Sequence, residues 1–297
     1  MALDTITLQK PLRKLRKTVR KLPRRPSPEL VHDLRTRIRR IEAQFQALLL
    51  DSRQNERKLL KALKPIRSRA GKVRDMDVLT SYALTLRPDA DEECLLELIE
   101  YLGAKRYRQA QKLHKVVGRD APATASRLKR SAKYIAKVCD NSSQRAGNAN
   151  VWPTDAMAVA LSLAKELSRW PRLNAGNLHP FRLKVKQLRY ILQLSDNSDS
   201  ALVETLGEVK DAAGEWHDWE ELAAIAAKVL DHDSGRDLLN VIRSTAAKKL
   251  HHALLIANRM RKDYLKRPSR IQRKGLRRPL TVLLKTPVVE AASSLAA

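Results

Sequence analysis

The amino-acid sequence predicts an all-α protein built from two similar helical halves. Leu, Ala, Lys, Arg and Glu dominate its 297 residues, and aromatic residues make up only 4%. This mix favours helices over strands. Apolar residues also recur at the three- and four-residue spacing of a helix along most of the chain. Two polar blocks occur twice in the same order, which indicates an internal duplication into residues 1–150 and 151–297.

The first half is expected to contain five helices. An apolar stripe beginning at Leu8 predicts the first, and Pro23 is expected to end it because proline destabilises a helix interior. Pro65 is expected to kink or split the third helix, while Gly118 and Pro122 are expected to separate the fourth from the fifth. The predicted ranges are 5–22, 28–50, 54–86, 91–117 and 123–139.

The second half is expected to repeat this plan after a linker. Residues 140–153 are small and polar without helical periodicity, which is typical of a linker. Four further helices are predicted over 154–169, 178–195, 199–230 and 235–265. Residues 266–297 form a basic stretch followed by an apolar tail, whose end is expected to fray.

The charge of the chain predicts an anionic partner. The formal net charge is +27, and residues 1–150 alone carry 35 Lys and Arg against 16 Asp and Glu. Such an excess repels itself unless an anion is bound, although weak nonspecific attachment to nucleic acid would also fit. Cys94 and Cys139 lack CxxC spacing, which favours a reducing compartment without a zinc site. With no signal peptide or membrane span expected, the prediction is a cytoplasmic protein without a membrane partner.

The first repeated block places a histidine and basic residues on one face of a helix. His32, Arg35 and Arg39 have the spacing of His179, Arg182 and Lys186, and Arg189 extends the second face. Steps of three, four and seven keep side chains on one helix face. Arg37 falls on another side and is expected to be solvated. A solvated charged face remains the alternative to an anion site, and a neutral packed histidine remains the alternative to a ligand-binding one.

The second repeated block sets small residues between basic ones. Arg67 and Arg74 flank Ala70-Gly71, just as Lys210 and His217 flank Ala213-Gly214. The small residues are expected to admit either another helix or a ligand, with helix crossing the favoured alternative. Asp75 and Asp218 follow directly and are expected to orient neighbouring basic residues.

Other kinds of chemistry fit the sequence less well. His32-Asp33 and His217-Asp218 match the HD pairs of metal phosphohydrolases, but Arg and Lys on the same helix faces would repel a cation. Glycine-rich phosphate loops are absent from the sequence, as is a recognisable nucleophile with its base. Most aromatic residues stand away from the basic faces, whereas single-strand binders interleave the two. The exceptions are Tyr190, Trp216 and Trp219.

These blocks resemble the CHAD family, the conserved histidine α-helical domain. The resemblance rests on VHDLRTRIRRIEA (31–43) with RAGKVRDMDVL (69–79), and on LHPFRLKVKQLRYIL (178–192) with LGEVKDAAGEWHDWEEL (206–222). It implies two pseudo-symmetric four-helix bundles in one compact unit with a central basic groove or pore. It also implies binding of inorganic polyphosphate, with location at polyphosphate granules in many members.

The resemblance further implies a stand-alone member of the family. Some members are fused to a CYTH triphosphatase domain, whose ExExK motif is absent from this sequence. Two positions depart from the family pattern, since Glu42 and Gln187 stand where its histidine helices often carry Arg. The departure at Glu42 predicts weaker binding at that end of the first histidine helix.

The sequence therefore predicts a non-catalytic polyphosphate-binding protein that needs no cofactor or metal. A metal-dependent phosphoanhydride hydrolase and a nonspecific nucleic-acid or granule-coat protein remain the alternatives. The predicted ligand-binding residues are His32, Arg35, Arg39, Arg67, Arg74, His179, Arg182, Lys186, Arg189, Lys210 and His217.

Overall fold

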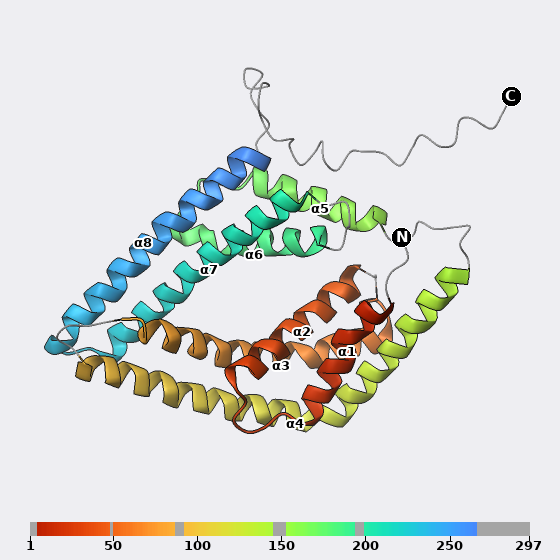
Figure 1. Cartoon of the computed structure of the whole chain (residues 1–297), viewed down its shortest axis with the longest axis horizontal. Coiled ribbons are helices and arrows are strands. Elements are labelled where there is room, and N and C mark those ends of the chain that lie inside the picture. The colour runs from red at the N-terminus through yellow and green to blue at the C-terminus, as the bar shows by residue number, and fades with distance from the viewer. Residues whose placement is uncertain (1–4, 48–49, 87–91, 145–152, 194–198, 266–297) are drawn as a thin grey trace, which may run out of the picture. The chain divides into compact units, whose positions relative to one another are not determined.

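The described residues of the computed structural model are helices joined by short connections, which confirms the all-α prediction (Figure 1). They comprise residues 5–47, 50–86, 92–144, 153–193 and 199–265. The chain forms two compact units. The first contains Met1–Trp152 and Asp218–Ser244, and the second contains Pro153–His217 and Thr245–Ala297. The pseudo-symmetry and the predicted division after residue 150 stay predictions.

Among the described residues, four α-helices precede residue 145 and four begin after residue 152. The first four are α1 (Thr5–Arg20), α2 (Pro28–Ala47), α3 (Gln54–Ala83) and α4 (Glu92–Gln144). The others are α5 (Pro153–Ser168), α6 (Ala175–Leu192), α7 (Ser200–Val229) and α8 (Arg236–Met260). A 3-10 turn, η1 (Asp233–Gly235), precedes α8, and a π-helical turn, η2 (Arg261–Leu265), follows it. By residue range, α7 and α8 each contribute to both units.

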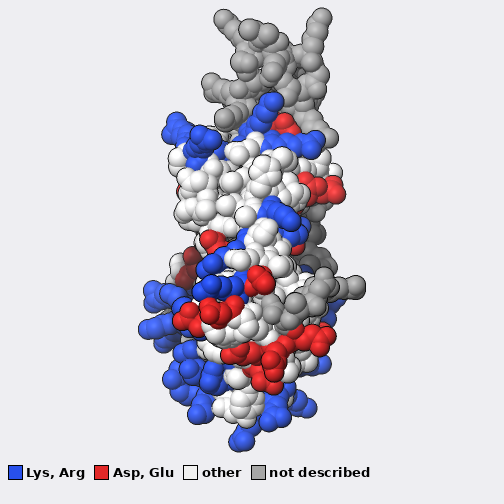
Figure 2. Space-filling model, turned by 90° about the vertical axis from the view of Figure 1, so that its left-hand side faces the viewer, with Lys and Arg blue, Asp and Glu red and all other residues white. Residues whose placement is uncertain are grey.

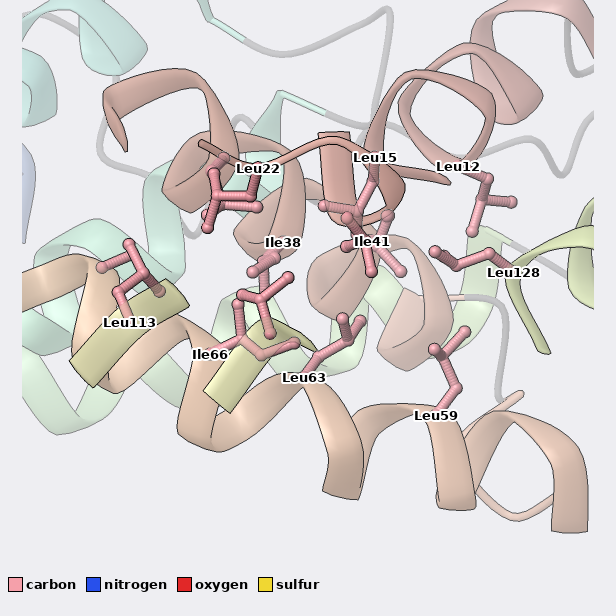
Figure 3. Packing of buried hydrophobic residues seen from close by; sticks show 14 of the residues in the cluster. Leu12, Leu15, Leu22, Ile38, Ile41, Leu59, Leu63, Ile66, Leu113 and Leu128 are labelled. Carbon is pink, nitrogen blue, oxygen red and sulfur yellow. The ribbon is translucent and has the colours of Figure 1, made fainter. Parts of the chain in front are cut away.

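The core of the first unit forms because its helices carry apolar stripes at helical spacing. Leu12 and Leu15 of α1 have no exposed surface, as predicted from the stripe that begins at Leu8. Figure 3 shows these leucines close to Ile41 of α2, with Leu63 of α3 on the other side of it. Burying side chains of this size stabilises the fold by about 1.5–3 kcal/mol each. The core thereby holds α2 and α3, which carry the repeated blocks, in place.

The predicted break at Gly118 and Pro122 is wrong, and Pro65 does not split the third helix. Helix α3 continues through Pro65, and α4 continues through Gly118 and Pro122 to Gln144. Proline costs about 3 kcal/mol in a helix interior, but Val117 and Leu128 on either side of Pro122 are buried in the core. This packing offsets the cost of the proline. Figure 1 shows α4 changing direction partway along its length, as proline in a helix commonly causes.

The predicted linker also begins later than expected. Residues 140–144 are the last residues of α4, and residues 145–152 lie outside the described residues. The predicted tail over 266–297 lies outside them as well.

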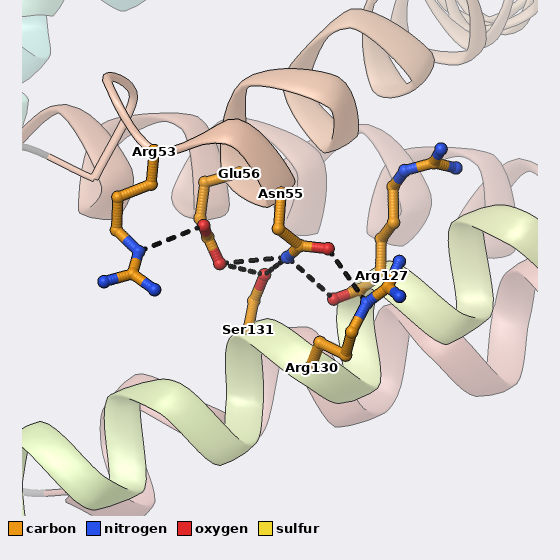
Figure 4. Close-up of polar contacts among 6 residues, drawn as sticks. All are labelled: Arg53, Asn55, Glu56, Arg127, Arg130 and Ser131. Carbon is orange, nitrogen blue, oxygen red and sulfur yellow. Dashed lines mark hydrogen bonds and ion pairs between the residues drawn. The ribbon is translucent and has the colours of Figure 1, made fainter.

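A polar network fastens the start of α3 to α4 (Figure 4). Glu56 is 1% exposed and accepts hydrogen bonds from Ser131 Oγ at 2.8 Å and Asn55 Nδ2 at 3.0 Å. Arg53 lies 3.4 Å from the same carboxylate, and Arg130 donates to Asn55 at 3.1 Å. Burial alone would raise the pKa of Glu56, but the hydrogen bonds outweigh it and hold the pKa below its ordinary value. The carboxylate is therefore a structural group satisfied within the fold.

The core of the second unit orients the second histidine helix. Phe181, Val185 and Leu188 of α6 have no exposed surface and belong to one cluster with Leu206 and Val209 of α7. Because this stripe faces inward, the basic residues between its members are left on the more exposed sides of α6.

Candidate functional site

Helix α6 begins at a capping box that sets the position of its histidine. The Asn174 side chain accepts from the backbone of Asn177, and the Asn177 side chain accepts from the backbone of Asn174. These reciprocal bonds satisfy donors that a helix start leaves unpaired. His179 follows in the second turn, and Arg182, Lys186 and Arg189 continue along the helix, all of them half-buried.

The two histidines of the second unit lie together. The ring centroids of His179 on α6 and His217 on α7 are 4.3 Å apart. Burial, the neighbouring His217 ring and the Arg182 charge all lower the pKa of His179. Its buried Nδ1 makes no hydrogen bond with any described residue. A bound anion would reverse the electrostatic effect, because a negative charge favours the imidazolium form.

Arg182 crosses from α6 onto the backbone of α7. Its Nε donates to the main-chain carbonyl of Lys210 at 3.0 Å. A Cβ atom placed on Gly214 would overlap Nη2 of this arginine and would lie 3.0 Å from its Cζ. The small residue predicted to admit another helix or a ligand therefore receives an arginine side chain from the neighbouring helix.

Arg189 repeats this contact seven residues further along α6. Its Nε donates to the carbonyl of Val203 at 3.2 Å, and a Cβ atom on Gly207 would lie 3.3 Å from that same Nε. The sequence interpretation did not single out Gly207. The signal that could have found it is its position seven residues before Gly214, which matches the seven residues between Arg182 and Arg189.

The lysines of this face have other neighbours. Lys186 Nζ lies 5.9 Å from the ring centroid of Tyr190, within cation–π distance. Lys210 Nζ pairs with the exposed Asp211 at 2.6 Å. We call His179, Arg182, Lys186, Arg189, Lys210 and His217 the second histidine face, and all six are predicted site residues.

The first unit brings its predicted residues together only in part. Arg35 of α2 approaches α3, with Nε 4.0 Å from the position of a Cβ on Gly71. His32 is exposed. Neither His32 nor Arg74 forms a hydrogen bond or ion pair with another described residue. We call His32, Arg35, Arg39, Arg67 and Arg74 the first histidine face.

A carboxylate occupies part of the first histidine face. Glu42 pairs with Arg67 at 3.2 Å. Burial raises the pKa of Glu42, while the charges of Arg67 and Arg39 act in the opposite direction. Arg67 therefore already has an anionic partner within the protein.

The predicted solvation of Arg37 is wrong. Its guanidinium pairs with Asp33 at 2.5 Å and donates to the hydroxyl of Thr18 at 2.9 Å. The reason is that α1 packs against this side of α2, so that only 19% of the Arg37 side chain is exposed. Arg37 thus fastens two helices rather than facing solvent.

One end of the first unit carries exposed carboxylates. Glu92 and Glu97 lie in the first turns of α4, and Asp231 and Asp233 lie at the α7–α8 connection. His232 of this connection contacts Glu97 at 3.2 Å. Figure 2 shows acidic side chains gathered in the lower half of the view, with Lys and Arg around them. A polyanion would be repelled here, so the candidate site is confined to the basic faces.

Two further findings concern the described ranges as a whole. They contain no cluster of three or more His, Cys, Asp or Glu side chains able to hold a metal ion. None of their helices is both long enough and apolar enough to cross a membrane.

Comparison with protein families decides the membership of the chain. The family model of the CHAD domain matches residues 6–227. The chain belongs to the CHAD family. The matched residues include both histidine helices and both Ala-Gly blocks, and the match confirms the resemblance. No curated protein matches the sequence.

Proposed function

We propose that this CHAD protein binds inorganic polyphosphate through its two histidine faces and does not hydrolyse it. The observation that carries the proposal is the second histidine face. There, Arg182 and Arg189 are fastened to α7 through Nε, and His217 lies beside His179. Guanidinium groups bind phosphate oxygens with charge-assisted and often bidentate hydrogen bonds. Membership of a family associated with polyphosphate binding supports the same conclusion.

The two tryptophans near the site favour a ligand made of phosphate alone. Trp216 and Trp219 flank His217 in the sequence, but they are only 3% and 5% exposed. Trp219 stacks on Tyr82 with ring centroids 5.1 Å apart. These rings belong to the packed interior, whereas proteins that bind single-stranded nucleic acid offer exposed rings to the bases.

The same side chains favour binding over hydrolysis. Cations and imidazoles make up the second histidine face, and Asp211 beside it is paired with Lys210. A metal-dependent hydrolase would need several carboxylates or histidines around a divalent ion. Polyphosphate granules are the place where a protein with this binding activity would be found in a cell.

The proposal is tested by titrating the protein with long-chain polyphosphate, with DNA and ATP as controls. The variant with Arg35, Arg39, Arg182 and Lys186 all changed to Ala should bind at least about 100-fold more weakly, because several charge-assisted contacts are lost. Its helical circular dichroism should be unchanged. A matched control changes four exposed cations of α4, namely Arg108, Lys112, Lys115 and Lys129, to Ala. Equal losses in the two variants would show that only net charge matters.

Catalysis is tested separately by phosphate release in the presence of Mg²⁺ or Mn²⁺. We expect no release above background from polyphosphate or ATP. Turnover that disappears in His32→Ala or His217→Ala would establish the hydrolase alternative instead.

A further inference from the structure

Gly207 and Gly214 lie at the two points where arginines of α6 reach the backbone of α7. In an α-helix, the carbonyl of one residue accepts from the N–H four residues later. The carbonyls of Val203 and Lys210 are therefore the helical acceptors for Gly207 and Gly214. Each arginine Nε donates to one of these two carbonyls. The same arrangement thus occurs twice along one pair of helices.

Close approach is the reason for glycine at these positions. Glycine destabilises a helix relative to alanine, so a glycine inside a helix is expected to have another structural role. Both residues are buried within α7, and neither has the positive φ that would call for glycine on conformational grounds. Outside the glycine's own stretch of helix, the three heavy atoms nearest to a Cβ added at either position all belong to an arginine side chain. The missing methyl groups leave room for the guanidinium groups beside their carbonyl acceptors.

The size of the expected clash differs among the glycines. A Cβ on Gly214 would overlap Arg182, and a Cβ on Gly207 would make a tight 3.3 Å contact with Arg189. Gly71, which has the same place in the first repeat as Gly214, would make only an ordinary 4.0 Å contact with Arg35. Gly103 of α4 has nothing within 4 Å.

We infer that Gly207 and Gly214 are positioning residues of the polyphosphate site, acting through Arg189 and Arg182. The inference rests on the proposed function and extends it to the class of ligand. Seven residues of helix separate the two arginines by about 10 Å along α6. A ligand that contacts both must span this distance, as a linear polyphosphate can and a single phosphate group cannot.

The first experiment compares four alanine variants of the full chain by titration with long-chain polyphosphate. Gly214→Ala should weaken binding about tenfold and Gly207→Ala about threefold, because a displaced guanidinium loses its aligned contacts. Gly71→Ala and Gly103→Ala should stay within about twofold of the unchanged protein. Pyrophosphate binding should respond less than polymer binding to either α7 variant. Equal affinities in all four variants would overturn the inference.

A double-mutant cycle separates positioning from a general effect on packing. If Gly214 acts through Arg182, Gly214→Ala should have no further effect on affinity in an Arg182→Ala background. A full and additive loss in that background would show that the glycine serves only the fold. Arg182→Lys keeps the charge but lacks Nε, so it should bind nearly as weakly as Arg182→Ala. A lysine variant with unchanged affinity would contradict the inference.

A measurement without ligand distinguishes failure of this inference from failure of the proposed function. In nuclear magnetic resonance spectra of the unchanged protein, the Nε–H groups of Arg182 and Arg189 should exchange slowly with water. Gly214→Ala should make the Arg182 signal exchange faster and leave that of Arg189 unchanged. Fast exchange of both in the unchanged protein would overturn the positioning role. If exchange is slow but no variant or protein preparation binds polyphosphate, the proposed function and the inference built on it both fail.

Discussion

The two histidine helices carry the same motif, but their cations have different surroundings. On α6, Arg189 donates to a backbone carbonyl across from Gly207. At the equivalent position of α2 stands Glu42, which pairs with Arg67 instead of adding a cation. At the position of α3 that is equivalent to Gly207 stands Lys64. The second face therefore gains one cation where the first face neutralises one.

This difference shows that two helices with the same residue spacing can differ in the charge of their histidine faces. A carboxylate beside a phosphate-binding arginine competes with the ligand for the same hydrogen bonds. A backbone carbonyl carries no net charge, so it orients an arginine without neutralising it. We therefore expect the second face to provide most of the affinity and the first face to provide a weaker, adjustable part.

The largest expected effect comes from disabling the faces one at a time. Arg182→Ala with Arg189→Ala should weaken binding of long-chain polyphosphate by about 100-fold or more, since each charge-assisted bond is worth about 1.5–3 kcal/mol. Arg35→Ala with Arg67→Ala removes the same charge and should cost about tenfold, because Arg67 is already paired. Isothermal titration calorimetry measures both. Equal losses would show that the Glu42 pair does not distinguish the faces.

A smaller effect is expected from removing the competing carboxylate. With Arg182 and Arg189 already changed to Ala, Glu42→Gln should strengthen the remaining binding about three- to tenfold. Asp33→Asn is the matched control, because Asp33 pairs with Arg37, which is not a predicted ligand-binding residue. If the two substitutions have the same effect, Glu42 has no specific influence on the site.

The pH dependence of the first face follows from the same carboxyl. Burial raises the pKa of Glu42 above its ordinary value of 4.5. As pH falls through this raised pKa, Glu42 loses its charge and ceases to compete, so binding approaches that of Glu42→Gln. The protonated form also suits the folded state better, so this group adds stability as pH falls through the same range. An affinity difference between the two proteins that persists at every pH would contradict this account.

The smallest expected effect concerns His179. Its pKa lies below the ordinary 6.5 because of burial, the His217 ring and the Arg182 charge. The unfolded chain therefore takes up the proton more readily than the folded chain. Protonation at His179 then lowers the stability of the fold as the pH falls below 6.5. A bound polyanion should raise this pKa and cause proton uptake on binding, measured by calorimetry in buffers of different ionisation enthalpy. His179→Gln should abolish that part of the uptake, and unchanged uptake would assign it to another group.

The sequence predicted the helical class, the repeated blocks and most helix ends to within a few residues. These properties depend on periodicity and on capping, which are local. The predicted break at Pro122 was wrong because buried neighbours such as Val117 and Leu128 offset a local cost. Local preferences commonly yield to tertiary packing in this way.

The role of the predicted site residues in binding stays a prediction, and their contacts within the fold could not be derived from the sequence. Helical spacing placed Arg182 and Lys186 on one face, but it could not show that a guanidinium would fill the space beside Gly214. Likewise, the angle between Arg37 and His32 on a helix wheel gave no indication that α1 covers Arg37. Such contacts depend on which helices pack together, and spacing within one helix does not determine that.

The salt dependence of polyphosphate binding is the most direct test of the central claim that both histidine faces bind a linear polyanion. If about eight cations contact the polymer, the log–log slope of affinity against salt should lie between about −5 and −6, at about −0.7 for each phosphate neutralised, as for single-stranded nucleic acids. Long-chain polyphosphate should also bind far better than pyrophosphate. Changing Arg182, Lys186, Arg189 and Lys210 to Ala should roughly halve the slope. A slope near −1 with equal binding of short and long phosphates would contradict the account.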